Sequence, residues 1–100
     1  MKVPKWFYLF ATKIEVVYDS QLCDHKHQYG QASYGESKIT LTKTDHTSKL
    51  SEGKILDTFY HEKIHMILET MNEYELSKNE KFVDVFAKLL RQSDETAVYE

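Results

Sequence analysis

The sequence predicts an α+β fold in which a small antiparallel β-sheet, made of an N-terminal hairpin plus a third strand, packs on two α-helices. β-branched and aromatic residues gather in short runs in the first 42 positions, whereas apolar residues recur at helical spacing after position 52. No internal repeat or low-complexity segment interrupts these patterns. The length of 100 residues, of which 41% are apolar, predicts one domain over residues 1–100.

The N-terminal half contains the predicted strands. The runs Lys5–Phe10 and Lys13–Tyr18 are rich in aromatic and β-branched residues and are separated by two residues, which is typical of a hairpin. Residues 19–33 have no usable periodicity and are expected to form a loop. In the run Lys38–Thr42 polar and apolar residues alternate, as expected of a strand with one face on a core.

Two amphipathic helices are predicted in the C-terminal half. From about Glu52 to Met71 there is no proline, and apolar residues recur every three or four positions. After a connector, the segment Ser77–Glu80 has the form of a capping box that opens a second helix, which extends to about Gln92. Each helix has one apolar stripe, so the two helices are expected to pack on each other and on the inner face of the sheet. The tail, Ser93–Glu100, is mostly polar, and its apolar residues Val98 and Tyr99 are expected to be able to pack on the rest of the protein.

Composition and charge exclude several classes of function. The formal charge of -3 and the presence of one arginine, Arg91, do not favour a nucleic-acid partner. The apolar run Trp6–Ala11 is far shorter than a membrane span, so no membrane partner is expected. One cysteine, Cys23, precludes an internal disulfide, and a cytoplasmic location is expected. Neither a P-loop nor a dinucleotide-binding fingerprint is present.

The first predicted helix contains the pattern His-Glu-x-x-His at residues 61–65. His61 and His65 differ by about 40° around a helix, so both imidazoles can reach one zinc ion. Glu62 is offset from His61 by about 100°, which places it where it can act as general base on a water beside the ion. In a chain of this composition the pattern would arise by chance roughly 0.02 times. The sequence therefore predicts one Zn²⁺ ion and catalytic Glu62.

A catalytic zinc site requires a third protein ligand. No histidine follows His65, so a carboxylate on the second helix is the natural candidate, and Glu80 borders that helix's apolar stripe. Glu80 could instead act only in the capping box. The remaining candidate ligands are Asp84, Glu73 and Glu75.

These residues resemble the small phage and prophage metallopeptidases related to the ImmA/IrrE group. The likeness rests on Thr58–His65 and on the run Asn79–Leu90 in the second predicted helix. The positions of this helix that match directly are Glu80, Phe86, Ala87, Leu89 and Leu90, while Val83 and Asp84 stand where the family has Ala-Asn. The resemblance implies a minimal zincin-like core of gluzincin type with Glu80 as third ligand. It also suggests that Asp84 orients a ligating histidine.

The resemblance further implies a hydrolase, encoded by a phage or prophage and acting in the cytoplasm of a bacterial host. Its partner would be a protein or peptide substrate, such as a repressor or a host factor. An extended peptide could pair with the free edge of the strand around Ile39 to Leu41. Tyr99, or else Tyr34, could stabilise the oxyanion of a tetrahedral intermediate.

The sequence is also compatible with functions other than hydrolysis. The zinc could be structural, in a small binding or regulatory protein without hydrolase activity. The motif could also be accidental, in a metal-free regulator. Cys23, His25 and His27 are potential ligands at every second position and could form a second metal site, although an ordinary polar loop is favoured. His46 is given no role. The sequence indicates neither the natural substrate nor the oligomeric state.

Overall fold

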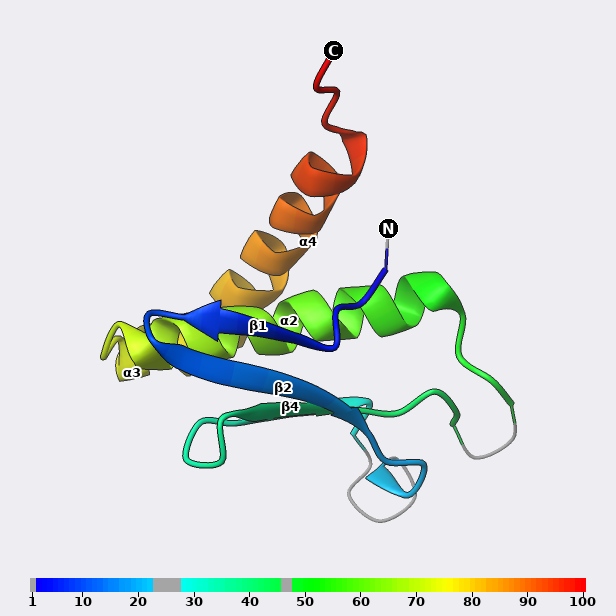
Figure 1. Cartoon of the computed structure of the whole chain (residues 1–100), viewed down its shortest axis with the longest axis horizontal. Coiled ribbons are helices and arrows are strands. Elements are labelled where there is room, and N and C mark those ends of the chain that lie inside the picture. Colours follow the sequence, from blue (N-terminus) through cyan, green and yellow to red (C-terminus); the bar gives the residue numbers. More distant parts are fainter. Residues whose placement is uncertain (1, 23–27, 46–47) are drawn as a thin grey trace.

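The computed structural model describes residues 2–22, 28–45 and 48–100. Its elements share the order predicted from sequence, with strands first and helices second (Figure 1). They are β1 (Trp6–Leu9), β2 (Thr12–Tyr18), β3 (Gly30–Ser33), β4 (Lys38–Leu41), α2 (Glu52–Thr70), α3 (Tyr74–Ser77) and α4 (Glu80–Thr96). The α+β class is therefore confirmed.

The sheet is four-stranded and mixed, in the order β1-β2-β4-β3. β1 pairs with β2 and β3 pairs with β4 in antiparallel fashion, whereas β2 and β4 are parallel, with Val16 opposite Ile39. The prediction of an all-antiparallel sheet of three strands was therefore wrong. The reason is topological: the chain first forms β3 at the outer edge and then returns as β4, which lies between β3 and β2 and so runs parallel to β2.

β3 lies within a segment that was expected to be a loop. Its sequence, Gly-Gln-Ala-Ser, contains no β-branched or aromatic residue. It becomes a strand because it pairs with β4, with Gly30 opposite Leu41 and Ala32 opposite Ile39. Tertiary pairing thus outweighs local propensity, and it creates an edge strand that the sequence pattern does not indicate.

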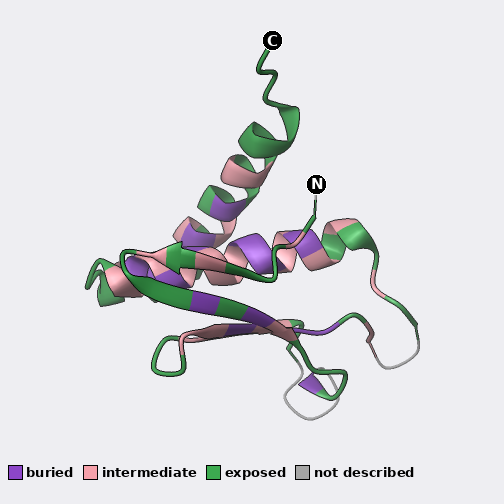
Figure 2. Ribbon diagram, viewed as in Figure 1, coloured by how far each residue is buried: buried purple, intermediate pink, exposed green. Residues whose placement is uncertain are grey.

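The sheet, α2 and α4 form successive layers (Figures 1 and 2). The inner face of the sheet, which includes Ile14 and Ile39, packs on the buried side of α2, which includes Phe59 and Ile64. α4 packs mainly on α2 and rises away from the sheet. The sheet and both main helices therefore share one core, but α2 covers the sheet more fully than α4 does.

The predicted apolar stripe of α4 is only partly buried. Val83 and Ala87 are buried, whereas Phe86 and Leu89 are 44% and 60% exposed. In the tail, Val98 and Tyr99 are exposed, and the expected docking does not occur.

The ends of the main helices follow from their capping residues. α2 nearly coincides with its predicted range, and Ser51 Oγ accepts a hydrogen bond from the Lys54 backbone N–H at 3.1 Å. The cap of α4 is Asn79, whose Oδ1 accepts from the Phe82 N–H at 3.0 Å. The capping box predicted from Ser77 is therefore wrong, because Ser77 ends α3 instead. Among the described residues, no helix has the length and apolar character required to cross a membrane.

Candidate metal centre

One face of α2 presents the two histidines of the motif side by side. His61 and His65 are one helical turn apart, and their ring centroids lie 5.0 Å from each other. Both residues are partly exposed and border the buried face of α2. This position leaves one edge of each ring available to a ligand while the ring itself is held by packing.

The first turn of α4 places Glu80 against both rings. His61 Nε2 lies 3.2 Å from Glu80 Oε2, and His65 Nε2 lies 3.4 Å from Glu80 Oε1. One ligand atom from each of the three residues lies within 4.8 Å of the others. The structure therefore brings His61, His65 and Glu80 together as a group that could hold a metal ion. The Glu80 side chain is 67% exposed, so the group is open to solvent on one side.

The donor set and its spacing fit a divalent cation. Two imidazole nitrogens and a carboxylate are one of the known ligand sets of catalytic zinc. Ligand atoms about 2.1 Å from a tetrahedral ion lie about 3.4 Å from one another. Each histidine lies at close to this spacing from one of the two Glu80 oxygens, and the three ligand atoms lie within 4.8 Å of one another. The donors suit zinc, but the spacing does not identify the ion.

Each histidine has a second partner at its other nitrogen. His65 Nδ1 lies 2.8 Å from Ser77 Oγ, and His61 Nδ1 lies 3.7 Å from Asp84 Oδ1. Asp84 also pairs with Lys88 at 3.0 Å. Because the Nδ1 atoms face these groups, the Nε2 atoms are the ones turned toward Glu80. Burial lowers the pKa of His65, which favours the neutral imidazole, while Glu80 acts in the opposite direction.

Ser77 was missed as a site residue because the sequence pattern assigns it to a helix cap. The short helix α3 folds it under His65, where it is buried. Its side chain can be connected with His65 only when the path of the chain between α2 and α4 is known. Local sequence contains no signal for this contact.

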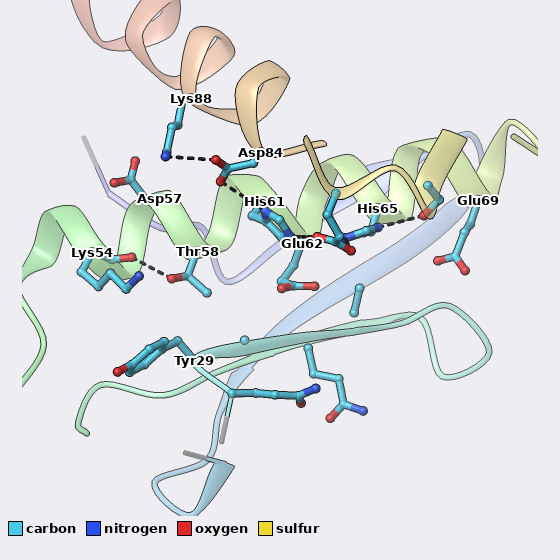
Figure 3. A pocket seen from close by; sticks show the side chains of 16 residues that line it. Tyr29, Lys54, Asp57, Thr58, His61, Glu62, His65, Glu69, Asp84 and Lys88 are labelled. Carbon is cyan, nitrogen blue, oxygen red and sulfur yellow. Dashed lines mark hydrogen bonds and ion pairs between the residues drawn. The ribbon is translucent and has the colours of Figure 1, made fainter. Parts of the chain in front are cut away.

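Glu62 points from α2 toward β3 (Figure 3). Its pKa is raised to about 7, mainly by burial; His61 and a hydrogen bond from the Ala32 backbone N–H act to lower the pKa, and Glu80 acts to raise it. Glu62 therefore lies next to both histidines and the edge strand, as a general base requires if the substrate lies between them.

A cleft of about 720 Å³ contains the metal-binding group, Glu62 and the edge strand. β3 forms one wall, and α2 and the start of α4 form the other. The free edge was predicted at Ile39–Leu41, but β4 is paired on both sides, so the edge beside the site belongs to β3. The Tyr29 carbonyl accepts a hydrogen bond from the Thr42 backbone N–H, so these two residues form a hydrogen-bonded pair. Hydrogen-bonded and non-hydrogen-bonded pairs alternate along an antiparallel ladder. The backbone N–H and carbonyl groups of Gly30 and Ala32 therefore point outward, away from β4.

Gly30 allows this wall to approach α2 closely. A Cβ atom at this position would lie 2.5 Å from Thr58 Cγ2 and 3.1 Å from Glu62 Cγ. Those distances are shorter than ordinary contacts, so a larger residue would force the strand and the helix apart.

Other predicted site residues lie elsewhere. Tyr99 is 87% exposed in the tail beyond α4, and neither Tyr99 nor Tyr34 lines the cleft. Glu73 and Glu75 are exposed at the start of α3, also outside the cleft. The candidate ligands at Cys23, His25, His27 and His46 lie outside the described residues.

Comparison of the chain with models of protein families, with curated proteins and with solved structures yields no match. The fold and the site define a small α+β protein with a group of residues that could bind a metal ion.

Proposed function

We propose that the protein is a zinc-dependent peptidase of gluzincin type, which hydrolyses a peptide bond in a protein substrate. His61, His65 and Glu80 hold the ion, and Glu62 is the general base. The observation that carries the proposal is the placement of both Nε2 atoms against Glu80 in the cleft that also contains Glu62 and the β3 edge. When bound, zinc supplies polarisation of a substrate carbonyl and activation of water.

The residues around the ligands have separate roles in this proposal. Glu62 takes a proton from the attacking water and then gives it to the leaving amine. Ser77 and Asp84 orient His65 and His61 through their Nδ1 atoms, so the Nε2 atoms remain directed at the ion.

The edge of β3 favours a peptide over a small molecule as substrate. Gly30 and the Ala32 carbonyl present backbone groups at the cleft that an extended chain could pair with. The Ala32 N–H is already bonded to Glu62, so the strand also helps to hold the base. A peptide paired with β3 would pass directly in front of the metal-binding group.

The resemblance to the ImmA/IrrE group supports the same class and suggests a phage or prophage protein that acts on a repressor or host factor in the bacterial cytoplasm. The alternative is a zinc-stabilised binding or regulatory protein without hydrolase activity. One observation favours that alternative: the three ligands come from α2 and α4, so an ion would also fasten these helices together.

Metal content and two substitutions, together with one control substitution, test the proposal. Purified protein should bind one equivalent of zinc, and Glu80→Gln should lose it, whereas Glu75→Gln should not. Glu62→Gln should keep the zinc but no longer cleave a mixed peptide library that the native protein cleaves.

The outcomes separate the two functions. Cleavage by Glu62→Gln at the native rate would remove Glu62 from the mechanism. Unfolding on chelation without cleavage of any substrate would favour the structural alternative. Absence of zinc at pH 7, even after reconstitution, would refute both.

A further inference from the structure

The cleft has charges of opposite sign at its two ends. We infer that it selects a peptide with a basic side chain on the N-terminal side of the scissile bond, bound by Glu69, and an acidic side chain on the C-terminal side, bound by Lys54. This inference rests on the proposed function and specifies its substrate class. It concerns two residues that are neither metal ligands nor the base.

Most charged side chains of the cleft wall already have partners. Arg91 Nη1 lies 2.6 Å from Asp57 Oδ1, and Lys88 Nζ lies 3.0 Å from Asp84 Oδ2. Within the described ranges, by contrast, neither Lys54 nor Glu69 forms an ion pair, although both line the cleft. Glu69 acts electrostatically on His65, raising the pKa of that ring against the larger lowering effect of burial, but no ion pair with a described residue neutralises the Glu69 carboxylate, so both charges are available to a ligand.

Lys54 and Glu69 lie at opposite ends of the cleft (Figure 3). The Lys54 ammonium lies over the ring of Tyr29, 4.8 Å from its centroid, just before β3 begins. Stacking on the ring keeps the cation at the entrance of the cleft without neutralising it. Glu69 is one turn beyond His65, on the same face of α2.

Both charges oppose the helix dipole. Lys54 is in the first turn of α2 and Glu69 is in the last turn, whereas the dipole favours anions at the start of a helix and cations at its end. Neither charge is therefore explained by the stability of α2. A bound peptide with complementary charges would offset the unfavourable interaction of both side chains with the helix dipole.

The dimensions match an extended peptide. Lys54 and Glu69 are fifteen positions apart, which is about 22 Å along a helix, and an extended chain covers this distance in about six or seven residues. The histidines lie between, so the basic side chain falls about three residues before the scissile bond and the acidic one about four after it.

The direction of β3 sets the order of the two charges. Gly30 lies against Thr58, while Ala32 bonds to Glu62 one turn later, so β3 and α2 run in the same direction. A peptide that pairs antiparallel to β3, the slightly more stable mode, has its N-terminal part at Glu69 and its C-terminal part at Lys54.

Fluorescent peptide pools test the inference. Two pools of equal net charge carry five randomised central residues without His, Cys or charged types. In one pool Arg precedes and Glu follows the centre, and in the other the two are exchanged. Fluorescence polarisation with zinc-loaded Glu62→Gln should show tighter binding of the first pool, by about two- to fivefold for each ion pair.

A charge exchange in the protein should reverse this preference. Lys54→Glu combined with Glu69→Lys, in the Glu62→Gln background, keeps the net charge and should favour the second pool. The matched control, Lys81→Glu with Glu73→Lys, changes the same charges outside the cleft and should bind like the parent. Circular dichroism checks that each variant is folded.

Each outcome decides one point. Equal binding of the two pools, including no binding of either, overturns the inference, as does preference for the second pool by the parent. If the native protein cleaves no peptide but the preference and its reversal are observed, the proposed hydrolysis fails while the charge selection stands. If the native protein cleaves both pools with equal efficiency and both pools bind equally, the charge selection fails while the proposed hydrolysis stands.

Discussion

His65 Nδ1 is hydrogen-bonded to Ser77 Oγ at 2.8 Å, although the two residues are twelve positions apart in sequence. Ser77 is buried at the end of α3, the short helix between α2 and α4. When Nε2 binds a metal, Nδ1 carries the proton and donates to the hydroxyl. The connection between the main helices therefore also positions a candidate ligand.

Ser77→Ala should weaken zinc binding by about 10- to 100-fold, because it removes the group that holds the His65 ring in orientation. The histidine itself stays in place, so binding should be reduced rather than lost. Competition with a chromophoric chelator measures the affinity.

Ser93→Ala provides the control, because Ser93 is exposed on α4, outside the cleft. It should bind zinc like the native protein. Native affinity in Ser77→Ala would show that this hydrogen bond does not tune the site.

Gly30→Ala should destabilise the fold by about 1–3 kcal/mol, because the new methyl group would overlap Thr58 Cγ2. Thr58 has little freedom to move, since its hydroxyl donates to the Lys54 carbonyl at 2.8 Å. Urea denaturation measures the loss of unfolding free energy.

Two further variants identify the cause. Thr58→Ser removes the overlapping methyl group, so adding it to Gly30→Ala should recover part of the loss in a double-mutant cycle. Gly35→Ala should be nearly neutral, because a Cβ there meets no atom within 4 Å. Additive effects of Gly30→Ala and Thr58→Ser would contradict the proposed contact.

The candidate metal-binding group was predictable because its pattern is local. His61 and His65 are placed by helix periodicity alone, and Glu80 borders the apolar stripe of the next helix. Once the two helices pack, the three side chains meet.

What the sequence missed depends on tertiary pairing. β3 has no strand-forming residues and is shaped by β4, so neither the mixed sheet nor the correct free edge was predicted. Tertiary packing also decides the exposure of Phe86, which matches the helical stripe of α4 but is 44% exposed because α4 packs mainly on α2. Periodicity identifies an apolar face but not how much of it is covered.

Tyr60 should titrate well above an ordinary tyrosine. Its pKa is raised to about 12, mainly by burial and next by the hydrogen bond that its hydroxyl donates to Asp94 Oδ2 at 2.7 Å. Because the pKa in the folded state exceeds the unfolded value of 10, the contribution to stability is present below pH 10 and is lost as the pH rises through 12. Absorbance at about 295 nm after a rapid pH jump follows this ionisation.

Asp94→Asn should move this step toward pH 10 but leave it above that value, because burial is the larger cause. Tyr60→Phe should remove the step and thereby assign it. A step that is unchanged in Asp94→Asn would show that the carboxylate does not act on Tyr60.

Glu69→Gln should stabilise the protein without metal or peptide. The substitution removes a negative charge from the last turn of α2, where the helix dipole disfavours it, and the gain should be about 0.3–1 kcal/mol at low salt. For a chain of this size the melting temperature should rise by about 2–6 °C.

Glu52→Gln, in the first turn of the same helix, removes a favourable charge and should lower the melting temperature instead. Both shifts should shrink in 1 M salt, because the charges are accessible to ions. A fall in melting temperature for Glu69→Gln would mean that Glu69 has a stabilising role in the fold, and the reason for assigning its charge to substrate binding would be lost.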